Sequence, residues 1–213
     1  SRLAVLYLAF SSASSVCAFR SVTSVSDARG GDIDAQAAVG QPLWGRFAQA
    51  MLEDFVEDAN YATAQDWANA REVASNAWAP SQSAAAVAWQ KKMAEFDGYI
   101  FVVAEYNRSI TGALKNALDQ AYVEWARKPM TAFAYGSVGG TRALEHLRNI
   151  AVELQMVPTR NAVHLGMGDF FKVHPGFGGS GNLADVEASL LPSAGAALDD
   201  LVWWANATKA ARG

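Results

Sequence analysis

The sequence predicts an α/β protein in which helices cover both faces of a five-stranded parallel sheet. From residue 84 onward, short apolar segments of strand length alternate with longer helical segments. Strands separated by helices cannot pair through hairpins, so they are expected to run parallel and to be covered on both faces. The length of 213 residues and the hydrophobic content of 51% fit one globular domain over 1–213.

Short apolar runs supply the predicted strands. Such runs, bounded by turn residues and of strand length, are typical of strands that are buried on both faces. A second strand of the sheet is expected from the less periodic stretch 60–75. The apolar runs lie at 2–10, 99–105, 130–136 and 160–166.

Longer segments between these runs have the apolar spacing of helices. Pro42 suits the first turn of one helix, and Gly98 suits the C-terminal end of another. Pro192 could interrupt the last one, because proline cannot donate the backbone hydrogen bond of a helix interior. The predicted helices span 42–59, 84–97, 111–126, 141–156 and 183–211.

The N-terminal run RLAVLYLAF at 2–10 admits two interpretations. It suits a buried parallel strand, and it is too short to span a bilayer. It also suits the apolar part of a signal peptide, because Arg2 precedes it and the small residues of SSASSVCA follow it. We favour the strand and a cytoplasmic protein. If 1–18 is instead an extension or a signal-like segment, the protein would be sent to an organelle or into the secretory route.

Charge and composition argue against several classes of protein. The net charge of −4 leaves no basic stripe of the kind that nucleic-acid binding requires. Cys17 is the single cysteine, so the chain has no disulfide framework. His146, His164 and His174 are too far apart for the ligand spacing of a zinc site. We expect them on a helix face, at a strand end and in a loop, and we assign no metal site.

Two loops at the carboxyl ends of predicted strands mark the candidate site. In parallel sheets, ligands bind beyond the carboxyl ends of the strands. The polar loop 104–109 follows one strand, and the glycine-rich stretch YGSVGGTR at 135–142 follows the next. Glycine lets the backbone approach a flat ligand closely, and Tyr106 could supply an aromatic wall. Either loop alone would more often be a simple turn, and Asn107 alone a turn or cap residue. The prediction therefore depends on both loops together.

The same loops resemble a known family. EYNRSITGALKNALD at 105–119 is similar to the signature of the flavodoxin-like, NAD(P)H-dependent FMN reductases, and AEFDGYIFVVAEYN at 94–107 resembles the segment that leads into it. YGSVGGTRALEHLRNIAVELQMVP at 135–158 resembles the second flavin loop and its helix, and LDDLVWWANA at 198–207 the C-terminal helix. The resemblance covers about 84–213.

This resemblance implies a flavodoxin-like three-layer sandwich that binds FMN. It implies that reduced NADPH or NADH passes hydride to the flavin, and that a quinone, flavin or other small electron acceptor is reduced in turn. The cofactor supplies this chemistry, so we assign no catalytic side chain. The implied FMN-binding residues are Glu105, Tyr106, Asn107, Ser137, Gly139 and Gly140.

The resemblance also implies a homodimer. Lys115, Asn116 and Asp119 lie on the helix that contributes to the subunit interface in relatives. That helix has more apolar residues than one sheet face needs, so we expect part of it to pack against a second copy. The apolar residues are Leu114, Leu118, Tyr122 and Trp125.

Three positions depart from the family pattern. Ala104 and Thr111 stand where the family has proline, which loosens the first loop. The phosphate loop after the first strand lacks the expected glycine and arginine. SSASS at 11–15 offers Ser11, Ser12 and Ser15 as phosphate-binding residues, and we favour it narrowly over SDARGG at 26–31.

Two other functions remain open at this stage. A one-electron carrier of flavodoxin type would want a strongly acidic docking face, which a net charge of −4 does not supply. A non-catalytic relative that binds a partner would explain a degenerate phosphate loop. The colour of the purified protein distinguishes these alternatives from the reductase.

Overall fold

The computed structural model describes residues 2–6, 19–22 and 84–213. Its strands form a single sheet in the order β2-β1-β3-β4-β5, and β6 also pairs with β4. All pairs are parallel except β1 with β2, which is antiparallel. The strands are β1 Leu3–Leu6, β2 Phe19–Val22, β3 Gly98–Ala104, β4 Pro129–Tyr135, β5 Val157–Pro158 and β6 Val163–Leu165.

These strands confirm the predicted parallel sheet, but the strands at its two edges differ from the prediction. β3 and β4 match the predicted runs almost residue for residue, and β1 confirms the strand for the first part of 2–10. β5 and β6 both pair with β4, at its start and its end, so they share one position in the sheet. The described sheet therefore has four parallel positions and the unpredicted antiparallel edge strand β2. The strand expected at 60–75 and the helix at 42–59 lie outside the described residues.

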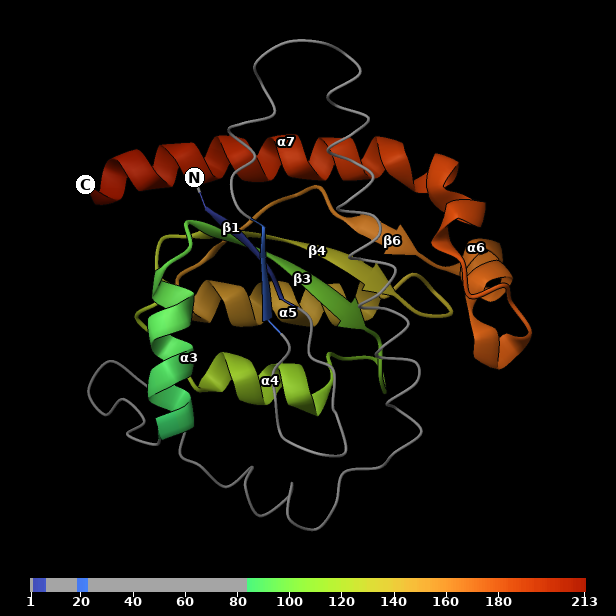
Figure 1. Cartoon of the computed structure of the whole chain (residues 1–213), viewed down its shortest axis with the longest axis horizontal. Coiled ribbons are helices and arrows are strands. Elements are labelled where there is room, and N and C mark those ends of the chain that lie inside the picture. The colour runs from blue at the N-terminus through green and yellow to red at the C-terminus, as the bar shows by residue number, and fades with distance from the viewer. Residues whose placement is uncertain (1, 7–18, 23–83) are drawn as a thin grey trace.

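Five α-helices surround this sheet in the described part of the chain. Figure 1 shows α7 along one face of the sheet and α4 and α5 along the other. Two short 3₁₀ turns, η2 Pro175–Phe177 and η3 Leu183–Val186, precede α7. The helices are α3 Ala84–Ala94, α4 Gly112–Asp119, α5 Thr141–Glu153, α6 Met167–Val173 and α7 Glu187–Arg212. Among them, none combines the length and the apolar character that crossing a bilayer requires.

Side chains of β3 explain the three layers. Every residue of β3 is buried, and successive side chains point to opposite faces of the sheet. Ile100 and Val102 join the core that contains the buried residues of α7, whereas Phe101 and Val103 join the core that contains those of α4 and α5. A strand that is apolar at every position is thus covered on both sides, which confirms the predicted three-layer arrangement.

The prediction of one helix over 111–126 is wrong, and so is the argument for a dimer drawn from it. α4 ends at Asp119, and Trp125 lies in the following turns, where it is fully buried. Its indole packs against Tyr99, with 4.8 Å between ring centroids, and donates to the carbonyl oxygens of Leu118 and Ala121. Leu114 and Leu118 are buried and Tyr122 packs against the same core. These apolar side chains therefore pack within the chain and do not form a surface for a second copy.

The C-terminal region also differs from the prediction. Residues 183–186 form the 3₁₀ turn η3, and α7 then continues through Pro192 without interruption. Pro192 is the sixth residue of this 26-residue helix, so its missing N–H removes one backbone hydrogen bond without ending the helix. The short helix α6 was not predicted, because its seven residues follow β6 with a single residue between them.

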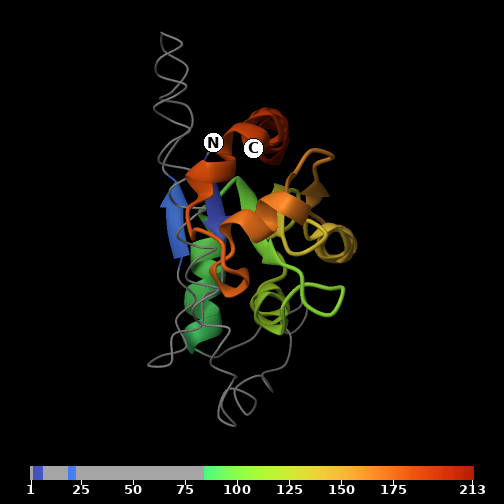
Figure 2. The same cartoon turned by 90° about the vertical axis from the view of Figure 1, so that its right-hand side faces the viewer.

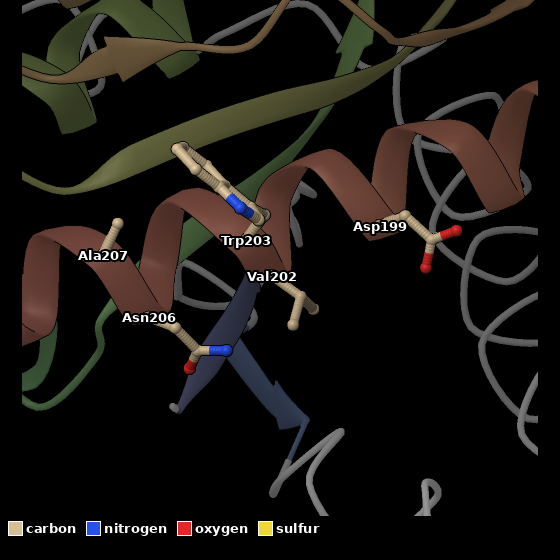
Figure 3. A pocket seen from close by; sticks show the side chains of 5 residues that line it. All are labelled: Asp199, Val202, Trp203, Asn206 and Ala207. Atoms are coloured by element: carbon tan, nitrogen blue, oxygen red, sulfur yellow. The ribbon is translucent and has the colours of Figure 1, made fainter.

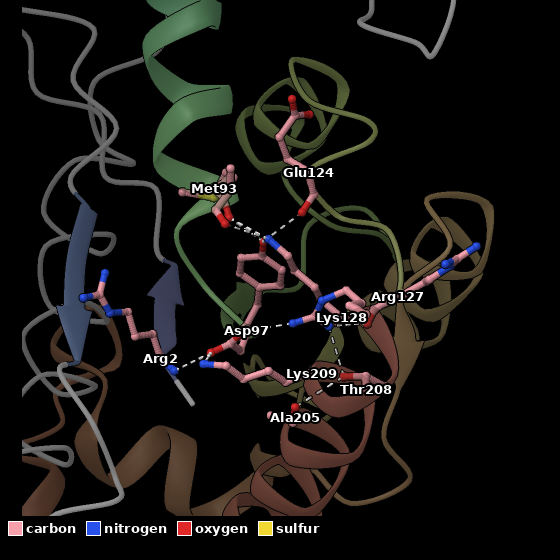
Figure 4. A network of polar contacts seen from close by, with 12 residues as sticks. Arg2, Met93, Asp97, Glu124, Arg127, Lys128, Ala205, Thr208 and Lys209 are labelled. Carbon is pink, nitrogen blue, oxygen red and sulfur yellow. Dashed lines mark hydrogen bonds and ion pairs between the residues drawn. The ribbon is translucent and has the colours of Figure 1, made fainter.

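A polar network lies at the amino ends of β3 and β4 (Figure 4). The Asp97 carboxylate accepts hydrogen bonds from the Arg2 backbone N–H, from Lys209 and from Arg212, each at 2.8–2.9 Å. Burial alone would raise the pKa of Asp97, but these bonds and the two positive charges outweigh it, so the pKa lies below its usual value. Asp97 therefore fastens β1 and the end of α7 to the start of β3.

Lys128 belongs to the same network and is buried. Its ammonium donates to the Met93 carbonyl oxygen at 3.0 Å and to the Tyr99 hydroxyl at 3.1 Å. Burial, helped by the charge of Arg212, lowers the pKa of Lys128 to about 8. Burial raises the pKa of Tyr99 above its usual value, so Tyr99 stays protonated in the folded protein.

This geometry predicts a rise in stability with pH. Between about pH 8 and about pH 10 the unfolded chain keeps the Lys128 proton that the folded protein has lost, so unfolding becomes less favourable as pH rises. The free energy of unfolding should increase by about 1–2 kcal/mol over this range, since each pKa unit corresponds to about 1.4 kcal/mol. Urea denaturation of wild type and Lys128→Met at several pH values checks it. Parallel curves for the two proteins would contradict the assignment to Lys128.

Candidate functional site

The candidate site lies where β3, β4 and β6 end at the same edge of the sheet (Figure 1). The backbone N–H of Glu105 donates to the carbonyl oxygen of Tyr135 at 3.0 Å, which joins the loops after β3 and β4. Gly136 donates to Leu165 at 3.2 Å, which joins the loop after β4 to β6. The two loops predicted from the sequence are thus neighbours.

Residues 106–109 form a tight turn after β3. Tyr106 and Ser109 exchange backbone hydrogen bonds of 3.0 and 2.8 Å. Asn107 and Arg108 between them have φ of 48° and 68°, and two positive values are typical of a type I′ turn. Asparagine tolerates this conformation, whereas arginine adopts it at a cost of about 1 kcal/mol. The turn holds the Tyr106 ring 43% exposed and the Asn107 side chain in solvent.

Asn107 is therefore a turn residue, which is one of the two interpretations that the sequence allowed. Its amide also remains accessible, because it forms no hydrogen bond within the part of the chain that the structure describes. An asparagine amide can donate and accept at the same time. The residue can thus shape the turn through its backbone and bind a ligand through its side chain.

Glu105 points away from the turn and into the protein. Its side chain is only 4% exposed, and its carboxylate forms an ion pair with Arg142 on α5. The same carboxylate accepts a hydrogen bond of 3.1 Å from the Arg142 backbone N–H, in the first turn of that helix. A negative charge at this position also favours the helix dipole. Glu105 therefore fixes one loop against the helix that follows the other, and its side chain is unavailable to a ligand.

Two further contacts hold the first loop. Ser109 lies with its hydroxyl 2.9 Å from Nδ1 of His146, which ties the turn to α5. Thr111 caps α4, because its hydroxyl accepts a hydrogen bond of 3.2 Å from the backbone N–H of Leu114. The Thr111 side chain thus stabilises the start of α4.

The glycine-rich loop owes its shape to positive φ and to close packing. Gly139 and Gly140 have φ of 78° and 64°. A Cβ at Gly140 would lie 2.6 Å from the backbone nitrogen of Tyr135, so no other residue fits there. Both glycines are buried, which leaves Ser137 and Val138 at the exposed tip of the loop. The backbone N–H groups of these two residues have no partner among the described residues, so both can donate to a ligand.

A third loop, after β6, belongs to the same site and was missed by the sequence analysis. Its Met167 donates a backbone hydrogen bond of 3.0 Å to Ser137, and Nδ1 of His164 lies 2.8 Å from the carbonyl oxygen of Gly139. A Cβ at Gly166 would lie 2.5 Å from the Cα of Gly139, so the two backbones touch. A glycine directly after a short apolar strand was the available signal.

The remaining predicted residues fall outside this geometry. Ser11, Ser12 and Ser15 and the alternative phosphate loop 26–31 lie outside the described residues. His146, His164 and His174 lie on α5, in β6 and after α6, as expected. Within the described ranges, no three His, Cys, Asp or Glu side chains are placed to hold a metal ion.

A hollow of about 510 Å³ lies elsewhere, along α7. Figure 3 shows that its labelled lining residues all come from this one helix. They are Asp199, Val202, Trp203, Asn206 and Ala207. Because α7 belongs to the covering layer and not to the strand ends, this hollow is not the site described above.

Comparison with known proteins identifies the family. Residues 46–169, more than half of the chain, match the family model for NADPH-dependent FMN reductase. An NAD(P)H-dependent FMN reductase of Nectria sp. is 40% identical over 75 residues, which are 34% of this chain and 37% of that protein. An NAD(P)H:quinone oxidoreductase of Solanum tuberosum is 41% identical over 78 residues, 32% of this chain and 38% of that protein.

These matches are partial. The matched stretch spans about two fifths of the length of these curated relatives. Among solved structures, the flavoenzyme NAD(P)H:(acceptor) oxidoreductase FerB of Paracoccus denitrificans is similar with a TM-score of 0.44 and 18% identity, over 70% of this chain and 75% of that one. The family match rests on the sequence, and it includes both loops of the site. The chain therefore belongs to the NADPH-dependent FMN reductase family.

Proposed function

We propose that the protein is an FMN-dependent oxidoreductase that uses NAD(P)H to reduce a quinone, free flavin or another small electron acceptor. The observation that supports this most is the family match over 46–169, because it includes both loops that meet at the carboxyl edge of the sheet. Curated relatives are named as FMN reductases and as quinone reductases, among them a 2-hydroxy-1,4-benzoquinone reductase of a Burkholderia species.

The residues at this edge fit a flat flavin. Tyr106 offers a half-exposed aromatic ring, and the Asn107 amide lies in solvent beside it. Ser137 and Val138 offer backbone N–H groups that can donate to the oxygen and nitrogen atoms along the edge of the ring. FMN, when bound, supplies the hydride chemistry between nicotinamide and acceptor. The protein's part is to bind and orient the ring, and Glu105 supports this by fixing the distance between the loops.

The proposal also includes features that the structure does not describe. We assign the phosphate of FMN to Ser11, Ser12 and Ser15, with 26–31 as the alternative, and a fifth parallel strand to 60–75. A homodimer now depends on the family resemblance alone, because the apolar residues near α4 are used in the core. A cytoplasmic location would fit the use of NAD(P)H.

Steady-state oxidation of NADPH by the purified protein tests the function. In the absence of oxygen and of excess flavin, the FMN-loaded protein should consume NADPH continuously only when an acceptor such as a quinone is added, and omission of FMN should abolish the rate. A protein that binds no FMN and consumes no NADPH would instead be the non-catalytic, partner-binding relative.

Replacing Asn107 by glycine tests the flavin site itself. Glycine keeps the positive φ without strain and removes only the amide. The loss of a hydrogen bond of about 0.5–1.5 kcal/mol should weaken FMN binding by about threefold to tenfold. Titration of FMN into the stripped proteins measures it. Arg108→Gly is the matched control, since it changes the next position of the turn and leaves the amide in place. Equal FMN affinity in Asn107→Gly and wild type would mean that Asn107 serves the turn alone.

A further inference from the structure

An exposed cluster of rings lies next to the site, on α6 and η2. We call Met167, Phe171 and Phe177 the apolar strip. Phe171 and Phe177 pack edge to face with 5.2 Å between ring centroids, and both contact the buried Phe170. Met167, Phe171 and Phe177 nevertheless remain 68%, 43% and 64% exposed. Neighbouring apolar side chains that are exposed to water often mark a binding site.

The backbone beneath the strip is held firmly. The His174 N–H donates to Phe170 at 2.9 Å, and the carbonyl oxygen of His174 accepts from Phe177 and Gly179 at 3.1 and 3.0 Å. A Cβ at Gly179 would lie 2.7 Å from the carbonyl oxygen of Phe171, so the loop returns tightly against α6. The rings are therefore presented in fixed positions, which lowers the entropy cost of binding a ligand on them.

The strip starts at the flavin site. Met167 is bonded through its backbone to Ser137, at the tip of the glycine-rich loop. Phe171 lies four residues later in α6. Phe177 continues the strip away from the loop, and Figures 1 and 2 show α6 and the following turns at the edge where β4 and β6 end. Phe171 and Phe177 lie beyond the residues matched by the family model, which end at 169.

The charged side chains beside the strip form hydrogen bonds with other parts of the chain. Lys172 donates to the carbonyl oxygen of Asp185 at 2.7 Å, and Asp169 accepts from the Ser189 hydroxyl at 2.7 Å. Burial lowers the pKa of His174, which favours its neutral form. The three side chains of the strip are themselves uncharged, and the Lys172 ammonium beside them is directed toward η3 by its bond to Asp185. The strip suits an uncharged planar ring.

We propose that the apolar strip binds the ring system of the electron acceptor, and that this acceptor is an uncharged quinone with more than one ring. The proposal rests on the function proposed above, because it places the acceptor beside flavin held at Ser137. Stacking and edge-to-face contacts with Phe171 and Phe177 would supply the affinity. The strip thus determines which acceptors the enzyme prefers and has no part in the binding of FMN.

The test compares two acceptors in the full chain. Ferricyanide needs no aromatic platform, whereas menadione, a two-ring quinone, can lie on the strip. In the Phe171→Ala/Phe177→Ala double variant, kcat/KM for menadione should fall about tenfold while the rate with ferricyanide stays unchanged. Trp203→Ala is the matched control, because Trp203 on α7 is 63% exposed, like Phe177, and should leave both rates unchanged. If the double variant does not fold, Phe177→Leu, which keeps an apolar side chain, replaces it. We then expect a smaller fall in kcat/KM for menadione and no change in the rate with ferricyanide.

Other outcomes overturn the proposal. Equal effects on both acceptors, or no effect on either, would show that the strip does not bind the acceptor. A slower anaerobic reduction of bound FMN by NADPH in the double variant would mean that the strip binds the nicotinamide nucleotide. A wild-type protein that oxidises no NADPH with either acceptor would contradict the proposed function itself, so the two failures are distinguishable.

Discussion

Gly166→Ala is expected to lower the free energy of unfolding by about 2–3 kcal/mol and to weaken FMN binding. Gly166 has an extended backbone, so alanine causes no dihedral strain. The added methyl group would instead lie 2.5 Å from the Cα of Gly139, well inside contact distance. Overpacking of this kind costs about 1–3 kcal/mol, and here the obstacle is backbone that cannot rotate away. The glycine-rich loop would have to move, and the N–H groups of Ser137 and Val138 with it.

Gly168→Ala is the matched control for this change. Gly168 lies two residues further on, inside α6, and a Cβ there would meet nothing within 4 Å. Alanine favours a helix interior over glycine by about 1 kcal/mol, so the control should be neutral or stabilising. Urea denaturation and FMN titration of both variants measure the two effects. Equal stability of the two variants would contradict the close contact between the loops.

Glu105→Ala is expected to destabilise the protein by about 2 kcal/mol and to weaken FMN binding as well. The buried carboxylate bonds both the Arg142 guanidinium and the first turn of α5. Hydrogen bonds to charged groups are worth about 1.5–3 kcal/mol, and we reduce the expected effect because Arg142 is 40% exposed. FMN affinity should fall because the Glu105 carboxylate holds the turn at 106–109 against α5, although it is itself out of reach of a ligand.

A surface ion pair provides the comparison. Lys115 and Asp119 form an exposed pair on α4 at 2.7 Å, and exposed pairs of this spacing contribute only about 0.3–0.5 kcal/mol. Asp119→Ala should therefore leave the melting temperature and the FMN affinity almost unchanged. If Glu105→Ala weakened FMN binding without any loss of stability, the carboxylate would contact the flavin directly and our account of its role would be wrong.

The sequence predicts those parts of this fold in which local pattern and burial agree. β3 and β4 are almost wholly apolar and are buried at every position, and α5 has clear helical spacing, so all three were located to within a few residues. The glycines of 136–140 were likewise informative, because positive φ at Gly139 and Gly140 is a local property of the chain. The position of each loop at a strand end was enough to bring the two together.

What the sequence does not predict depends on contacts between distant residues. Trp125 has the spacing of a continued helix, but α4 ends at Asp119 and the Trp125 indole packs against Tyr99, which is distant in the sequence. Glu105 belongs to the polar stretch after β3, but its partner Arg142 is 37 residues away. Gly166 contributes to the site through contact with Gly139, which no local pattern reveals. A polar residue in a loop can thus serve a ligand or the loop itself, and only the fold distinguishes the two.

Anaerobic titration with NADPH tests the central claim most directly. The protein, reconstituted with FMN and freed of excess cofactor, should be yellow, because the loops after β3 and β4 retain the flavin. NADPH should bleach the visible flavin absorbance, and a quinone added afterwards should restore it. A protein that FMN cannot turn yellow, or one that stays yellow when NADPH is added, would contradict its assignment as an FMN-dependent reductase.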